Sequence, residues 1–99
     1  LFFLNGEKKY SYPGKTVRLD KFLKVSSLIK RRPLAQAACK GGRVLVNGKV
    51  AKPGMEIKPG DEITVFAPTY KIVVRVKSVG EREKGEELYE MLKKEKIEE

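Results

Sequence analysis

A short amphipathic helix is predicted by the stretch Arg18-Leu19-Asp20-Lys21-Phe22-Leu23-Lys24. Its apolar side chains follow the i, i+3 and i+4 spacing of one helix face, at Leu19, Phe22 and Leu23. A separate stripe of basic residues, each three positions apart, consists of Arg18, Lys21 and Lys24. Asp20 lies in the first turn, where the helix dipole favours a negative charge. We therefore expect one face to pack into a core and another to present positive charge.

A second short helix is expected at residues 34–40. The basic connection Lys30-Arg31-Arg32 precedes it. Pro33 suits the first helical position, because its φ is fixed near a helical value and its missing amide donor is not needed there. The helix is expected to end at Gly41-Gly42, which can adopt the left-handed cap conformation. Its buried residues are expected to be Leu34, Ala37 and Ala38.

Strands are expected after the two helices. β-Branched residues predict a strand at 43–47, and Asn47-Gly48 is a favoured tight turn that leads into a return strand at 49–51. Further strands are expected at 62–66 and 70–79. Alternation predicts one buried face for the last of these strands, consisting of Ile72, Val74 and Val76.

The end of the chain is predicted to be helical. Residues 80–85 form a charged linker in this interpretation, and 86–97 form an amphipathic helix whose early glutamates and late lysines suit the helix dipole. Its apolar side would carry Leu88, Tyr89, Met91 and Leu92. The expected fold class is α+β, with two short helices packed on a small twisted β-sheet and a C-terminal helix. The expected divisions are an N-terminal extension or mis-assigned leader at 1–16, a core domain at 17–79, and a linker with the C-terminal helix at 80–99.

Positive charge is segregated along the sequence. The chain holds 22 Lys and Arg against 13 Asp and Glu, a formal charge of +9. The window from Arg18 to Lys52 contains ten basic residues and one acid, Asp20, so it carries a charge equal to that of the whole chain. A concentrated field of this kind holds a polyanion better than an evenly mixed surface does. Nucleic acid is therefore the expected partner.

The candidate RNA-contact residues lie on the two helices, their connection and the hairpin. Arg31 and Arg32 are the preferred anchor, because their guanidinium groups and the first amides of the second helix could meet the same phosphate. Few aromatic residues interleave with the cations, so phosphate and shape recognition of structured RNA is favoured over base stacking. The full candidate set is Arg18, Lys21, Lys24, Lys30, Arg31, Arg32, Lys40, Arg43, Asn47 and Lys49.

The sequence contains few of the residues and motifs that catalytic sites use. The chain has no histidine, no Gly-rich phosphate loop and no metal-ligand spacing around its single cysteine. Cys39 would be a nucleophile only if Lys40 and Arg43 lowered the pKa of its thiol, and it is expected instead to be a buried structural residue. We expect no enzyme activity, no cofactor and no metal. Apolar runs are too short to span a bilayer, and a cytoplasmic location is expected.

Four motifs resemble the S4 RNA-binding domain family in order and spacing over about residues 17–66. They are Arg18-Leu19-Asp20-Lys21-Phe22-Leu23, the basic junction before Pro33-Leu34-Ala35, Gly42-Arg43-Val44-Leu45-Val46-Asn47-Gly48-Lys49-Val50, and Lys58-Pro59-Gly60-Asp61. The resemblance implies an αL RNA-binding motif, in which two helices and a β-hairpin present a cationic surface to structured RNA. Ser27 departs from the pattern, since relatives often have arginine there, and relatives begin near Val17.

Among stand-alone members, the chain is similar to the RqcP (YabO) family and related to the small ribosome-associated heat-shock protein. This resemblance implies a ribosome-associated quality-control factor that binds large-subunit ribosomal RNA and peptidyl-tRNA on obstructed large subunits. It further implies support for C-terminal alanine tailing of stalled chains by an RqcH-type tailing factor. Arg18 and Arg32 match the family's functional arginines. Off the ribosome we expect a monomer.

Two alternatives remain open from the sequence. The chain could be an RNA-binding accessory module of an RNA-modifying enzyme whose catalytic part is missing, although the glutamate-rich end is expected to be a finished terminus. It could also be a protein-interaction module that uses the apolar stripe of residues 86–97. We expect that stripe to pack on the sheet instead, as amphipathic helices in small domains usually do.

Overall fold

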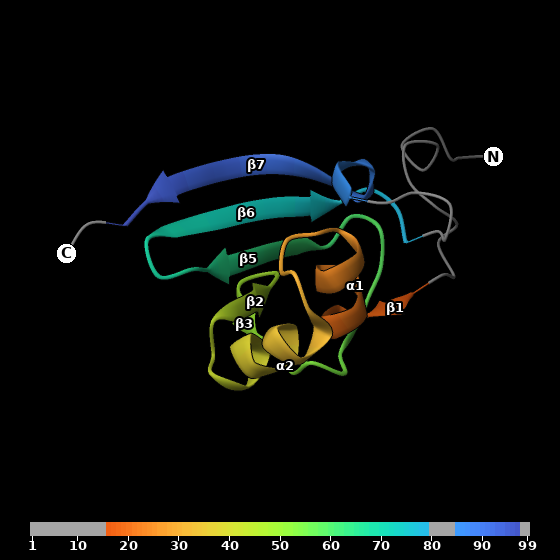
Figure 1. Cartoon of the computed structure of the whole chain (residues 1–99). Helices are drawn as coiled ribbons and strands as arrows, with labels where there is room; N and C mark the ends of the chain where they lie inside the picture. The colour runs from red at the N-terminus through yellow and green to blue at the C-terminus, as the bar shows by residue number, and fades with distance from the viewer. Residues whose placement is uncertain (1–15, 80–84, 98–99) are drawn as a thin grey trace.

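The computed structural model describes residues 16–79 and 85–97 (Figure 1). The expected α+β class is confirmed, while the predicted extension at 1–16 lies, apart from Thr16, outside the described residues, as does most of the predicted linker. The elements in order are β1 (Val17–Arg18), α1 (Leu19–Val25), α2 (Arg32–Lys40), β2 (Val44–Val46), β3 (Lys49–Val50), β4 (Glu56–Ile57), β5 (Glu62–Phe66), β6 (Tyr70–Val76), the 3₁₀ helix η2 (Gly85–Leu88) and β7 (Tyr89–Lys96).

A five-stranded antiparallel sheet in the order β3-β2-β5-β6-β7 forms the centre of the fold. The short strands β1 and β4 make a separate antiparallel pair that brings Val17 opposite Ile57. Both helices lie near β2 and β5, whereas the ends of β6 and β7 opposite η2 extend beyond the helices (Figure 1). One end of the sheet is therefore covered by helices and the other is not.

The core lies between the helices and one face of the sheet. The predicted apolar side of α1 is fully buried there, and the predicted face of β6 is buried as well. Each large apolar side chain that is fully buried contributes about 1.5–3 kcal/mol, so this face supplies much of the stability. The helix side of the sheet consists of Val44, Val46, Ile63, Val65, Ile72, Val74 and Val76.

The second helix differs from its prediction in its first residue and in which of its faces is buried. It begins at Arg32 rather than at residue 34, and its buried residues are Ala35 and Cys39. Leu34, predicted to be buried, is 54% exposed. Ala35 and Cys39 are four residues apart and so share a face, and their small side chains let α2 approach α1 closely.

The predicted Asn47-Gly48 turn is confirmed. Both residues have positive φ, 53° and 86°, which is the conformation a two-residue hairpin turn of this type requires. The Asn47 side chain also ties the turn to β5, because its Nδ2 donates to Asp61 Oδ1 at 3.2 Å and its Oδ1 accepts from the Glu62 amide at 3.0 Å. The hairpin is thereby held against the start of β5.

The predicted C-terminal helix is wrong. Residues 85–88 form one 3₁₀ turn, and β7 continues from Tyr89 along the whole of β6, pairing Tyr89 with Val76 and Lys96 with Tyr70. The apolar stripe that was predicted to pack on the sheet is instead part of the sheet. In the described ranges, 16–79 and 85–97, no helix is long and apolar enough to cross a membrane.

A β-bulge explains why the sequence of β7 looks helical. The register shifts between Val73 and Val74, which leaves Leu92 as an extra residue between Met91 and Lys93. The extra residue interrupts the alternation that would reveal a strand. As a result, Leu88, Met91 and Leu92 stand at the i, i+3 and i+4 positions that are typical of one helix face. Pairing with the otherwise open edge of β6 then outweighs the weak strand propensity of the lysines and glutamates.

This correction predicts a specific pattern of amide protection and cross-strand contacts. NMR of the intact chain should show nuclear Overhauser effects between Val73 and Lys93 and between Arg75 and Glu90, which are paired in the structure. Amides of β7 that bond to β6 should exchange at least about tenfold more slowly than unprotected ones, because opening them requires breaking the ladder. A run of i to i+3 contacts through residues 89–96 would contradict the strand.

Candidate nucleic-acid interface

A fully buried carboxylate, that of Asp20, organises the junction between the two helices. Its Oδ2 atom accepts from Gln36 Nε2 at 2.9 Å and from Arg18 Nη2 at 3.1 Å. Arg32 Nε lies 3.3 Å from the same oxygen, close enough for an ion pair although not aligned as a hydrogen bond. Oδ1 accepts from the Lys21 amide at 2.7 Å. Asp20 therefore joins the start of α1 to two residues of α2.

The environment of Asp20 keeps it ionised. Burial alone would raise the pKa of this carboxyl, but the hydrogen bond from Gln36, the Arg32 guanidinium and the Lys21 amide together hold it below its ordinary value of 3.8. A charged carboxylate without water must be paired. Here it is paired with two cations, so the junction keeps a net positive charge.

The guanidinium groups of Arg18 and Arg32 are held by Asp20 on one side and exposed to solvent on the other. The Arg18 side chain is 51% exposed and the Arg32 side chain 42%, while each places one nitrogen near Asp20. A guanidinium has five N–H donors. Both arginines therefore retain donors that point away from the buried carboxylate.

The loop between β3 and β4 supports the same junction. Its Pro53 and Met55 carbonyls accept from the amides of Asp20 and Leu19 at 3.1 and 2.8 Å. A Cβ atom at Gly54 would lie 3.7 Å from Arg18 Nη2, so this loop also packs beside the Arg18 side chain. The first two amides of α1 are thus bonded by a neighbouring loop, and the N-cap residue Arg18 makes no side-chain cap.

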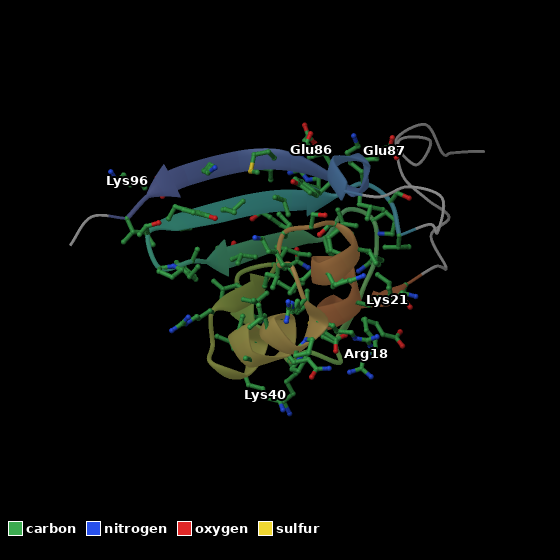
Figure 2. All side chains as sticks on the ribbon, in the orientation of Figure 1. Arg18, Lys21, Lys40, Glu86, Glu87 and Lys96 are labelled. Carbon is green, nitrogen blue, oxygen red and sulfur yellow. The ribbon has the colours of Figure 1, made fainter. Side chains whose placement is uncertain are left out.

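The other candidate residues are spread over the helices and the hairpin. Lys21 and Arg31 are exposed close to the junction, and Lys24 and Lys30 are exposed near the other end of α1. Lys40 and Arg43 lie at the C-terminal end of α2, whereas Lys49 lies on β3 beside the Asn47-Gly48 turn. α2 has nine residues, so about 13 Å of helix separates the junction from Lys40. Figure 2 shows Arg18 and Lys21 beside α1, Lys40 at the end of α2, and Glu86 and Glu87 on the opposite edge of the fold.

Two junction residues were missed by the sequence interpretation. Asp20 was assigned only to the helix dipole, and Gln36 was not considered. The signal for Gln36 was present, since it lies four residues after Arg32 and therefore on the same face of α2. Asn47, a predicted contact residue, has its side-chain amide bonded within the fold.

Cys39 is buried as predicted. Burial, together with the charge of Asp20, raises the pKa of the Cys39 thiol to about 11. The thiol is therefore protonated near neutral pH, and the basic neighbours Lys40 and Arg43 do not activate it as a nucleophile.

Comparison with known proteins adds to this geometry. The S4 domain family matches residues 17–63, from β1 into β5. The RQC P-site tRNA stabilizing factor of Halalkalibacterium halodurans is 49% identical over 84 residues, which cover 82% of this chain and 96% of that protein. The chain belongs to the RQC P-site tRNA stabilizing factor family. The member from Bacillus subtilis is 46% identical over 84 residues, covering 82% of this chain and 98% of that protein.

A solved structure supports the same fold for the RQC P-site tRNA stabilizing factor family. The trimeric structure of Vibrio cholerae Heat Shock Protein 15 superposes with a TM-score of 0.70 at 29% sequence identity. The match covers 79% of this chain and 83% of that chain. The predicted relation to S4 proteins, including the small heat-shock protein, is confirmed.

Proposed function

We propose that this chain is a non-enzymatic RNA-binding factor of ribosome-associated quality control in the cytoplasm. It binds large-subunit ribosomal RNA and peptidyl-tRNA on obstructed large ribosomal subunits and so supports C-terminal alanine tailing of stalled chains by an RqcH-type factor. The observation that carries the proposal is the junction of Arg18, Asp20 and Arg32, in which one buried carboxylate fixes two half-exposed guanidinium groups. The names of its relatives, which refer to RQC and to P-site tRNA, support the same function.

The junction suits phosphate binding by preorganisation. A free arginine loses side-chain entropy when it binds a phosphate, whereas Arg18 and Arg32 are already held by Asp20. Their remaining N–H donors can bind phosphate oxygens in the fork geometry that arginine offers and lysine does not. The junction therefore sets the position of the RNA backbone on the domain.

The surrounding cations extend this contact. Lysines act as point charges that neutralise phosphates without a fixed geometry, so they add affinity around the arginine anchor. Off the ribosome the protein is a monomer in this proposal. The further contact residues are Lys21, Lys24, Lys30, Arg31, Lys40, Arg43, Asn47 and Lys49.

Co-sedimentation with purified large ribosomal subunits tests the function. Subunits that carry peptidyl-tRNA should bind the chain at least about tenfold more tightly than vacant subunits, because only they present both RNAs. The affinity should also fall with salt, with a log–log slope of at least about two from the two arginine contacts alone. If vacant subunits and subunits with peptidyl-tRNA bind the chain equally well, tRNA is not a partner. If the log–log salt slope is near zero, the chain does not recognise phosphates.

A further inference from the structure

Charge is unevenly distributed along the last strand. The acids Glu86, Glu87 and Glu90 lie in η2 and at the start of β7, whereas Lys93, Lys94 and Lys96 lie in its second half. Figure 2 shows Glu86 and Glu87 at one end of β7 and Lys96 at the opposite end. The end of β7 that extends beyond the helices is therefore its basic end.

The bulge at Leu92 divides these charges between the two faces of the sheet. Paired residues of an antiparallel ladder share a face, and the register pairs Lys93 with Val73 and Glu95 with Lys71, on the side away from the helices. Without the extra residue, Lys93 and Glu95 would lie on the helix side instead. The bulge thus places the only acid among residues 93–97 on the outer face.

Ion pairs occupy the outer face. Glu95 contacts Lys93 at 3.0 Å and Lys71 at 3.9 Å. The hydrogen bond from Lys93, with the charges of both lysines, holds the pKa of Glu95 below its usual range despite a small opposing effect of desolvation. Glu95 therefore offsets one of the two positive charges of Lys71 and Lys93.

On the helix side of the same strand end, two lysines have no acidic partner among the residues that the structure describes. Lys94 and Lys96 face this side because they pair with Ile72 and Tyr70. Neither lysine forms an ion pair within the ranges 16–79 and 85–97, and Lys94 Nζ lies 5.1 Å from the centre of the Tyr70 ring. A cation–π contact orients an ammonium group and leaves its hydrogens accessible. Met91, 45% exposed, lies on the same face.

Backbone hydrogen bonds connect this strand end to the basic residues after α2. The Arg43 amide donates to Ala38 at 3.0 Å, and the Arg43 carbonyl accepts from Phe66 at 2.9 Å. One residue later, the Ala67 amide donates to the Tyr70 carbonyl at 2.8 Å. Arg43 and the C-terminal end of α2 therefore lie at the same end of the sheet as Tyr70.

We propose that Lys94 and Lys96, with Tyr70 positioning Lys94, form a second RNA contact that binds the sugar–phosphate backbone. The proposal rests on the RNA-binding function proposed above and adds a site that lies outside the S4 match at 17–63. An acidic protein segment would also complement two lysines. RNA is favoured because the site lies at the end of the sheet at which α2 ends, and because two lysines on one face of a strand can neutralise successive phosphates as point charges.

Two double variants with equal charge loss test the site on large subunits carrying peptidyl-tRNA. The test variant is Lys94→Gln with Lys96→Gln, and the control is Lys71→Gln with Lys93→Gln on the opposite face of the same two strands. The test variant should bind about tenfold more weakly, with a salt slope lower by about two. The control should change the affinity less than about twofold. Melting temperatures of both variants establish that they fold.

The outcomes separate this site from the general function. If the wild-type chain does not bind the subunits, the proposed function fails. If it binds and the test variant binds equally well, the second contact is overturned while the function stands. An equal loss of affinity in both double variants would also overturn the second contact, because the loss would then depend on net charge and not on the helix-side face.

A photo-crosslink identifies the occupant. Benzoylphenylalanine in place of Met91 lies on the helix-side face of β7 and should crosslink to RNA when Lys94 and Lys96 are intact. Crosslinks to ribosomal or other proteins alone would overturn RNA as the occupant.

Discussion

Replacing Arg32 with alanine is expected to weaken binding to obstructed large subunits about tenfold to a hundredfold. The estimate follows from the loss of a charged hydrogen bond, which contributes about 1.5–3 kcal/mol, when the phosphate has no substitute donor. The log–log salt slope should fall by about one, as expected for one lost phosphate contact. Co-sedimentation at several salt concentrations measures both effects.

The variant is expected to remain folded. Asp20 retains its hydrogen bonds from Arg18, Gln36 and the Lys21 amide, so its carboxylate is not left unpaired. Arg75→Ala is a matched control, since Arg75 is 38% exposed and ion-paired with Glu90 on the outer face of the sheet. Arg75→Ala should leave binding within about twofold. Unchanged binding of Arg32→Ala would contradict the assignment of the junction.

The variant Asp20→Asn distinguishes two roles of Asp20, because each role predicts a change of RNA affinity in the opposite direction. The substitution removes a negative charge from a basic surface, so long-range electrostatics alone would tighten RNA binding. If Asp20 acts by fixing Arg18 and Arg32, binding should weaken instead, by about threefold to tenfold, because both arginines must then be ordered by the RNA. Asp61→Asn is the control, since Asp61 is also buried but contacts no arginine among residues 16–79 and 85–97. Tighter binding of Asp20→Asn would contradict positioning.

The same variant should change stability in a pH-dependent way. The pKa of Asp20 is lower in the folded chain than its ordinary value of 3.8, so its ionised contacts stabilise the fold above that value and are lost as pH falls through the lower one. At pH 7 we expect Asp20→Asn to lower the free energy of unfolding by about 1–3 kcal/mol, in the range for weakened buried hydrogen bonds. Urea unfolding should show this difference narrowing below pH 3.8. A difference that is the same at pH 2.5 and pH 7 would contradict an ionised Asp20.

Local patterns in the sequence predicted much of the fold. β5 occupies the predicted residues 62–66, and the buried side of α1 is the predicted one. The Asn47-Gly48 turn was predictable because its φ requirement is local. The last strand was not predictable, because the bulge at Leu92 hides its alternation and its partner β6 precedes it by some twenty residues.

The candidate site was predictable in composition but not in arrangement. A run of cations between Arg18 and Lys52 is visible in the sequence. The role of Asp20 depends on contacts with Gln36 and Arg32 that form only when α2 packs on α1. Similarly, the division of the β7 lysines between two faces depends on one extra residue in the ladder. Both features are set by tertiary packing.

The most direct test of the RNA-binding junction is ultraviolet crosslinking of the chain to RNA in cells, followed by sequencing of the bound RNA. Wild-type reads should be enriched over total RNA at defined sites in large-subunit ribosomal RNA and in tRNA, and Arg32→Ala should lose that enrichment while Arg75→Ala keeps it. Reads distributed in proportion to RNA abundance, or the same enriched sites at the same level in Arg32→Ala, would contradict the account.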